Sequence, residues 1–237
     1  MLGEFEVELE AVPGLDRQVD ALWMATKATQ LEAALPLASP EQVGESLVIP
    51  LLNGVDHLAL LRSRYVNVVA AAIRVESERD APGLIRQSSP FLRVEIVGAE
   101  PVQEALRAAG IECSGRDDEV SLLWDKLVFL APLALATTAA GAPFGSVRGD
   151  ERFVGCREEA IAVAQAERAK VDADAIRALH ERAPAEMRSS MQEDVAAGRQ
   201  PELDAIAGPI IRGGARHDIP TPNTTALAAE IQANTSS

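Results

Sequence analysis

The sequence predicts an α/β layer over residues 1–116, followed by an all-helical part over residues 117–237. Short apolar runs alternate with helical patterns as far as about residue 116, which is typical of a doubly wound, largely parallel sheet. Beyond Asp117 the strand signals stop and one helical pattern follows another. The chain has 237 residues, which is long enough for two such parts.

Composition indicates an aliphatic core and excludes some classes of partner. Hydrophobic residues make up 47% of the chain and aromatic residues only 3%, which favours helices and buried parallel strands. The net charge of −14 argues against binding to nucleic acid or to an anionic membrane surface. The two cysteines and three scattered histidines indicate neither a disulfide framework nor a metal site. No secretory signal opens the sequence, so a cytoplasmic location is expected.

In the first part, residues 1–12 alternate polar and apolar and are expected to form an edge strand or hairpin arm. The apolar runs that predict the other strands are residues 19–26, 46–52, 66–75 and 93–97. The spacings Thr29 to Glu32 and Ser39 to Gln42 each predict a capping box that opens a short helix. Further helices are expected over residues 56–63 and 100–109, with a turn at residues 80–83.

In the second part, the helices are expected over residues 119–140, 151–170, 173–183, 184–197, 201–217 and 223–233. Asp117 and Asp118 are natural N-caps for the first of them. Its apolar run is long enough to raise the question of a membrane-spanning segment. Because the run is rich in Ala, Thr, Gly and Pro, we expect a buried helix of a globular core instead.

Lys126 lies at the start of this apolar helix, and no other charge follows it until Arg148. Helical spacing places Lys126, Leu130 and Ala134 on one face, and Pro132 is expected to kink the helix. An ammonium in apolar surroundings is costly unless it has a partner or a function. The alternative interpretation is a lysine that extends its charged end to water at the mouth of a buried helix.

Lys27 and Asn53 each follow the carboxyl end of an expected strand, which is the edge where open α/β sheets bind ligands. A lysine there can hold a carboxylate or phosphate, and an asparagine can orient a carbonyl or a ribose. The alternatives are a solvated lysine at a helix start and an Asn-Gly turn. Glu202 and the pair Ser189 and Ser190 form a third candidate site, although a carboxylate in the first turn of a helix is favourable through the helix dipole alone. Serines within a helix usually face water.

A phosphate-binding glycine loop is missing from this sequence. None of the sixteen glycines falls in a G-x-G pattern after a strand. The residues alone therefore predict no pyrophosphate-binding turn.

Taken together, five segments resemble the ketopantoate reductase (2-dehydropantoate 2-reductase) family. They are ATKATQ (25–30), PLLNGV (50–55), LWDKL (123–127), SSMQEDVAAGRQPELDAIAG (189–208) and HDIPTPNT (217–224). Their order and spacing fit over nearly the whole chain, and the last two segments are the specific ones.

The resemblance implies an incomplete Rossmann-like parallel sheet domain over residues 1–116 and a helical substrate domain over residues 117–237. It also implies a cytoplasmic oxidoreductase of pantothenate biosynthesis that reduces ketopantoate or a related 2-keto acid with NADPH. The expected partner is this small molecule, with no nucleic acid, membrane or metal, and the alternatives for its assembly are a monomer and a homodimer.

The resemblance also assigns roles to individual residues. Lys126 matches the catalytic lysine that protonates the carbonyl oxygen, and Glu202 matches an acidic residue near substrate and cofactor. Asn53 matches a residue that orients substrate and nicotinamide, and Ser190 matches a serine that binds substrate. Lys27 and Gln30 match a K-x-x-Q pair at the cofactor edge.

Two departures from the family pattern carry expectations of their own. The family opens with a strand and a glycine-rich loop that would precede Met1, so we expect a shortened gene model; the alternative is a non-catalytic remnant. Leu130 and Ala134 occupy positions where the family presents asparagines. We therefore expect a lowered pKa for Lys126, and a reductase of a more apolar keto acid is a further alternative.

Overall fold

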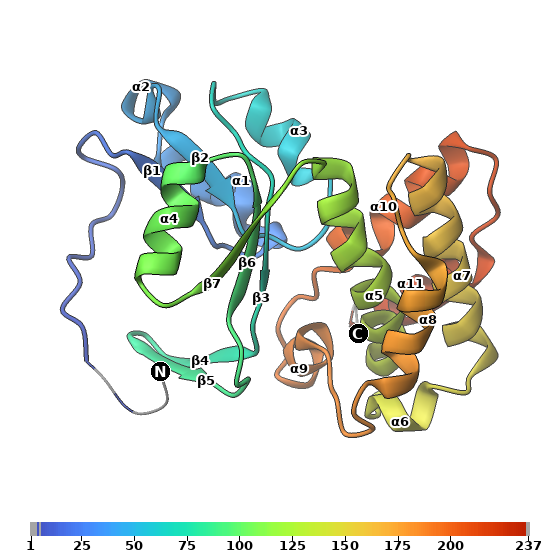
Figure 1. Cartoon of the computed structure of the whole chain (residues 1–237). Coiled ribbons are helices and arrows are strands. Elements are labelled where there is room, and N and C mark those ends of the chain that lie inside the picture. Colours follow the sequence, from blue (N-terminus) through green and yellow to red (C-terminus); the bar gives the residue numbers. More distant parts are fainter. Residues whose placement is uncertain (1–3, 5, 236–237) are drawn as a thin grey trace.

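The computed structural model describes residue 4 and residues 6–235. A sheet domain and a helical domain lie side by side, and the long helix α5 (Glu119–Ala140) begins against the sheet and continues into the helical domain (Figure 1). The two-part organisation expected from the sequence is therefore observed.

The strands of the sheet domain are β1 (Ala21–Met24), β2 (Leu47–Pro50), β3 (Ala71–Arg74), β6 (Arg93–Val97) and β7 (Glu112–Arg116). β1 pairs with β2 in parallel, and an isolated parallel bridge between Val48 and Val68 links β2 to the segment before β3. β6 pairs with β7 in parallel but with β3 in antiparallel orientation. The strand pairing is thus mixed. Each of the four apolar runs contains a strand, whereas β7 was not expected.

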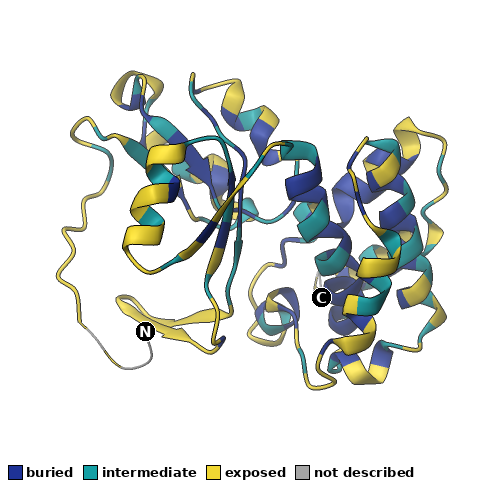
Figure 2. Cartoon of the chain, in the orientation of Figure 1, coloured by how far each residue is buried: buried dark blue, intermediate teal, exposed yellow. Residues whose placement is uncertain are grey.

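A β-hairpin projects from the sheet between β3 and β6. Its strands are β4 (Ser77–Ala81) and β5 (Leu84–Gln87), and every residue in both is exposed (Figure 2). The turn expected at residues 80–83 joins them. Residues 6–12 belong to no strand, so the expected edge strand is wrong there. Residues 1–3 and 5 of that expectation lie outside the described part.

The helices of the sheet domain are short: α1 (Leu31–Ala34), α2 (Pro40–Val43), α3 (His57–Arg62) and α4 (Glu100–Ala108), with single 3-10 turns at Ala28–Gln30 and Leu35–Leu37. The capping box before α2 is confirmed, because Ser39 N donates to Gln42 Oε1 at 3.0 Å and Gln42 N donates to Ser39 Oγ at 3.4 Å. The box expected at Thr29 is wrong, because the 3-10 turn already begins at Ala28 and places Thr29 inside it.

The helical domain contains α5, α6 (Phe144–Val147), α7 (Glu151–Ala166), α8 (Ala173–Arg182), α9 (Ser190–Ala196), α10 (Leu203–Arg216) and α11 (Pro222–Thr235). The helix expected from residue 184 begins only at Ser190. The preceding residues pair with α6 instead, because the Phe144 and Gly145 amides donate to the carbonyls of Met187 and Ala185 at 2.9 and 2.7 Å.

Helix α5 is the core helix of the molecule. Asp118 caps it by accepting from the amides of Val120 and Ser121 at 3.1 and 3.3 Å, and the helix continues through Pro132 to Ala140. By length and composition it could cross a membrane, but 72% of its most apolar window is buried inside the protein. Leu122 and Leu123 pack into the core of the sheet domain, and most of the remaining buried residues pack into the helical domain.

Candidate functional site

Glu202 joins the two domains at the carboxyl ends of β1 and β2. It is the N-cap residue of α10 and is 8% exposed. Its Oε1 accepts from the backbone amide of Ala28 at 2.7 Å, and its Oε2 accepts from Asn53 Nδ2 at 3.2 Å. The carboxylate is therefore held by donors from the segments that follow both strands. The structure thus brings together Asn53 and Glu202, which the family resemblance places near the same substrate and cofactor.

The turn after Asn53 requires a glycine. Gly54 has a φ of +86°, and a Cβ atom at this position would lie 2.5 Å from the carbonyl oxygen of Ala205 in α10. A side chain there would push the turn away from the helix. The backbone of Gly54 therefore lies directly against α10 of the other domain, and the preceding side chain of Asn53 reaches Glu202.

Lys126 lies in the first half of α5, close enough to Glu202 for an electrostatic interaction, and its pKa is lowered to about 8. Burial is the largest cause, the positive charge of Arg74 is the second, and Glu202 partly opposes both. Lys126 Nζ has no hydrogen-bond or ion-pair partner among the residues that the structure describes. Leu130 and Ala134, half-buried and buried on the same helix, offer no side-chain partner either. The ammonium therefore keeps its donors free for a ligand.

Lys27 forms an ion pair with Asp194 of α9 across the domain boundary. The Asp194 side chain is 4% exposed and also accepts from Arg199 Nε at 2.8 Å. Gln30 is exposed, and its side chain forms no hydrogen bond with a site residue in the described part of the chain. For Lys27 and Gln30, the role in cofactor binding stays a prediction.

The two serines of the third candidate site have different environments. Ser189 is 4% exposed, caps α9 by accepting from the Gln192 amide, and lies 3.1 Å from Thr137 Oγ1 through its Oγ. Ser190 is exposed, and no hydrogen bond within residues 6–235 joins it to Lys126 or Glu202. Its role in substrate binding stays a prediction.

Two further residues, His57 and Arg74, lie near Lys126 and were not expected from the sequence. His57 is 7% exposed, and neither ring nitrogen has a hydrogen-bond partner within residues 6–235. Burial, and then the charge of Lys126, lower its pKa to about 4, so it is neutral near pH 7. The sequence feature that could have identified His57 is its position four residues after Asn53. For Arg74, the signal was its position at the end of an apolar run, because strand ends carry ligand-binding residues.

A hollow of about 630 Å³ lies beside Thr29, Arg199 and Pro201, and it contains none of Lys126, Asn53 and Glu202. No group of three or more metal-ligating side chains lies among the described residues. Asn53 and Glu202 suit the polar ribose and amide of a nicotinamide. The described residues include no glycine-rich turn between a strand and a helix that could hold a pyrophosphate. They therefore fit the nicotinamide end of such a cofactor and offer no turn for its pyrophosphate.

Family models match both parts of the chain. The model described as "Ketopantoate reductase PanE/ApbA" matches residues 3–98, and the model described as "Ketopantoate reductase PanE/ApbA C terminal" matches residues 120–235. The 2-dehydropantoate 2-reductase of Mycobacterium tuberculosis (strain ATCC 25618 / H37Rv) is 31% identical over 228 residues, covering 91% of this chain and 76% of that protein. The corresponding enzyme of Caulobacter vibrioides is 30% identical over 227 residues, covering 91% and 77%.

Solved structures agree in fold. A PanE/ApbA family ketopantoate reductase from Ralstonia eutropha JMP134 superimposes with a TM-score of 0.83 at 28% identity, over 92% of this chain and 76% of that one. D-mandelate dehydrogenase, in a ternary structure with NADH and anilino(oxo)acetate, reaches a TM-score of 0.86 at 21% identity over 94% and 79%. With these matches over most of its length, and with Asn53 and Glu202 joined where its two domains meet, the chain belongs to the ketopantoate reductase family of oxidoreductases.

Proposed function

We propose that this protein reduces ketopantoate or a related 2-keto acid with NADPH, giving the 2-hydroxy acid of the pantothenate pathway. The observation that carries the proposal is Lys126, whose ammonium has no partner in the described part of the chain and whose pKa is lowered to about 8, near the carboxylate of Glu202. A general acid works best when its pKa lies near the working pH. Family membership supports the same chemistry.

In this proposal the nicotinamide cofactor supplies a hydride to the carbonyl carbon. Lys126 hydrogen-bonds to the carbonyl oxygen and donates a proton to it as negative charge develops there, and it regains that proton from water after product release. Glu202 favours the protonated form of Lys126 and fixes one amide hydrogen of Asn53. The remaining amide hydrogen and the oxygen of Asn53 are free to orient substrate and nicotinamide.

Replacing Lys126 tests the proposal. We expect Lys126→Met to lower kcat for keto-acid reduction by roughly 10²–10⁴-fold, because the general acid is lost. The matched control is Lys170→Met, since the Lys170 side chain is 83% exposed and makes only a 3.9 Å ion pair with Asp118. NADPH oxidation should be followed in the 237-residue chain and in the same chain extended by any in-frame residues encoded upstream. An absence of turnover with every keto acid in both proteins would contradict the proposal.

A second candidate is a reductase of a more apolar keto acid. Half-buried Leu130 and buried Ala134 follow Lys126 on its helix and offer no hydrogen bond to a substrate hydroxyl. Comparing kcat/KM for ketopantoate and for 3,3-dimethyl-2-oxobutanoate, which lacks the hydroxyl, distinguishes the two. A clear preference for ketopantoate would exclude this candidate.

A third candidate is a non-catalytic member of the family, because the described residues include no glycine-rich turn that could hold a pyrophosphate. Binding of NADPH to the chain, measured by calorimetry, would count against it. NADH should be tested alongside NADPH, because the fold neighbour D-mandelate dehydrogenase was solved with NADH. A homodimer is also part of the proposal, and light scattering tests it.

A further inference from the structure

Arg74 is the last residue of β3, a strand that packs against α5. Its Nε donates a long hydrogen bond of 3.4 Å to Glu95 on the neighbouring strand β6, and its side chain is 32% exposed. Neither Nη1 nor Nη2 has a partner among the described residues. The outer edge of the guanidinium, which is the edge that binds carboxylates in a bidentate way, is therefore available.

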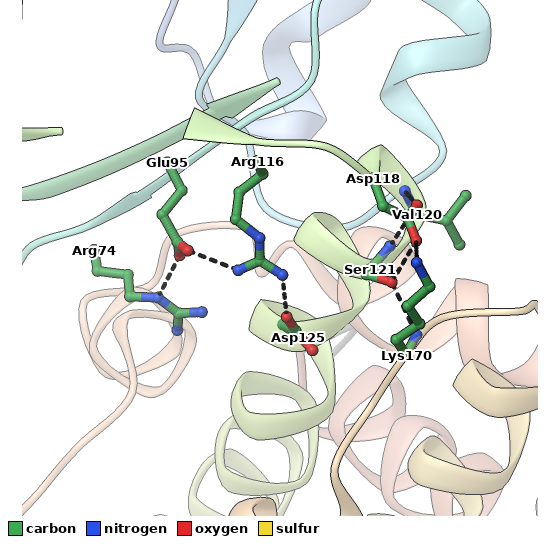
Figure 3. Close-up of polar contacts among 8 residues, drawn as sticks. All are labelled: Arg74, Glu95, Arg116, Asp118, Val120, Ser121, Asp125 and Lys170. Atoms are coloured by element: carbon green, nitrogen blue, oxygen red, sulfur yellow. Dashed lines mark hydrogen bonds and ion pairs between the residues drawn. The ribbon is translucent and has the colours of Figure 1, made fainter. Parts of the chain in front are cut away.

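A chain of alternating charges holds Arg74 in place (Figure 3). Glu95 is 12% exposed and also accepts from Arg116 Nη1 at 2.8 Å. Arg116 Nη2 in turn donates to Asp125 on α5 at 2.7 Å. Asp125 immediately precedes Lys126, so the network connects the position of Arg74 with the part of α5 that carries the proposed general acid.

Arg74 and Lys126 are thus two cations near the same place. The strand β3, which ends at Arg74, packs against α5, which carries Lys126, and the charge of Arg74 lowers the pKa of Lys126. Two like charges held together in partly buried surroundings repel one another, and an anion bound between them relieves that repulsion. Glu95 does not fully neutralise the pair, because it is shared with Arg116.

A 2-keto acid has the matching arrangement of groups. Its carboxylate is bonded directly to the carbonyl carbon that is reduced, so the anion and the oxygen that accepts the proton lie on adjacent atoms. We propose that Arg74 binds the carboxylate of the substrate through Nη1 and Nη2 while Lys126 binds the carbonyl oxygen. This assignment rests on the proposed reductase function and names Arg74 as the residue that selects 2-keto acids over neutral ketones.

The first test compares a charged with a neutral substrate. In Arg74→Gln we expect kcat/KM for the 2-keto acid to fall roughly 10- to 100-fold, mainly through KM, because a charge-assisted hydrogen bond is lost. For the ethyl ester of the same keto acid we expect little change. Arg74→Lys keeps the charge without the planar fork and should show a smaller loss. Equal losses for acid and ester would overturn the proposal, because Arg74 would then act through Lys126 or through the fold.

The matched control is Arg93→Gln. Arg93 lies directly opposite Arg74 in the β3–β6 register, but its side chain is 50% exposed and pairs with Glu112 at 2.7 Å. This variant should leave both substrates unaffected. A thermal unfolding curve of each variant shows whether it is folded.

A binding experiment separates this inference from the proposed function. Calorimetry measures the affinity of the chain for anilino(oxo)acetate and for its neutral methyl ester, each with saturating NADPH. If the wild type reduces keto acids and Arg74→Gln has an unchanged KM, the inference fails and the function stands. If the wild type reduces none but binds the carboxylate in a way that Arg74→Gln weakens at least tenfold, the function fails and the inference stands. Failure of the wild type to bind the carboxylate would overturn the inference.

Discussion

At the scale of single residues, the surroundings of Lys126 set its acidity. Burial and Arg74 lower its pKa from 10.5 to about 8, while Glu202 acts in the opposite direction. The side chain is therefore still mostly protonated near pH 7, yet it releases its proton far more readily than a lysine in water. Arg74 and Glu202 come from different domains, so this acidity depends on how the two domains meet.

The proposed mechanism makes the rate of reduction depend on pH in a defined direction. The proton donor is the charged form of Lys126, so we expect kcat to be constant below about pH 8 and to fall as the pH rises above it. Glu202→Gln removes a group that raises this pKa and should move the falling limb to lower pH. Arg74→Gln removes a group that lowers it and should move the limb to higher pH.

The measurement is a pH–rate profile of reduction for the wild type and both variants. Glu32→Gln, an exposed position in α1, is the matched control. Limbs that do not move in either variant would contradict the assignment of Lys126 as the titrating group.

At the scale of secondary-structure elements, α11 is held by a buried carboxylate from another helix. Glu159 of α7 is 8% exposed and accepts from the backbone amides of Asn223 and Thr224 at 2.8 Å each. The side chains of the same two residues donate to it at 2.7 and 2.6 Å. The end of the HDIPTPNT segment, one of the most specific family motifs in the sequence, therefore anchors the start of α11.

Removing this anchor should destabilise the helical domain. We expect Glu159→Gln to lower the free energy of unfolding by roughly 1–3 kcal/mol, because donors at the start of α11 lose a charged acceptor. Glu230→Gln is the control, because the Glu230 side chain is 39% exposed and forms a surface ion pair with Arg152. This substitution should change the free energy of unfolding by less than about 1 kcal/mol. Denaturant titration measures the free energy of unfolding of both variants and of the wild type. A Glu159→Gln variant as stable as the wild type would contradict the anchoring role.

The elements also show what sequence patterns can and cannot predict. The bounds of α5 were predicted correctly because Asp118 caps it and Gly141, at a φ of +60°, ends it. β7 was missed because it is a five-residue strand with Cys113 as its single buried residue, which leaves no apolar run or alternation to detect. The hairpin was missed because both of its faces are exposed.

The same contrast holds for the candidate site. Glu202 and Asn53 follow clear local signals, a helix start and a strand end, and the structure joins them. The pairing of Lys27 with Asp194 and the proximity of Arg74 to Lys126 depend on long-range packing, because these partners are far apart in the sequence. Single-sequence patterns carry no information on such pairs.

At the scale of the whole molecule, each domain buries one histidine in neutral form. His57 lies in the sheet domain, and His180 is stacked on Phe129 in the helical domain at a centroid distance of 4.7 Å. Burial is the main cause that lowers the pKa of each from 6.5 to about 4. Both histidines are neutral in the folded protein above about pH 5, whereas the unfolded chain takes up protons below its own pKa of 6.5.

This difference predicts a loss of stability in mild acid. No contribution is expected above the unfolded pKa. As the pH falls from 6.5 towards 4, the unfolded state binds protons that the folded state excludes, so each histidine should lower the free energy of unfolding by roughly 2 kcal/mol between pH 7 and 5. Denaturant titration at these two pH values measures the loss. His57→Gln and His180→Gln should each reduce it, and an undiminished loss in both variants would contradict the expectation.

Helix α5 has a consequence for anyone who builds chimaeras from this family. The sequence alone suggests a crossover near residue 116, between the two domains, but α5 supplies Leu122 and Leu123 to one core and Leu127 onwards to the other. Whichever parent donates this helix must therefore match both halves of the hybrid. A crossover after Gly141 keeps α5 with the sheet domain. The new parent must then match α5 and also the contacts that Asp194 and Glu202 make with the sheet domain.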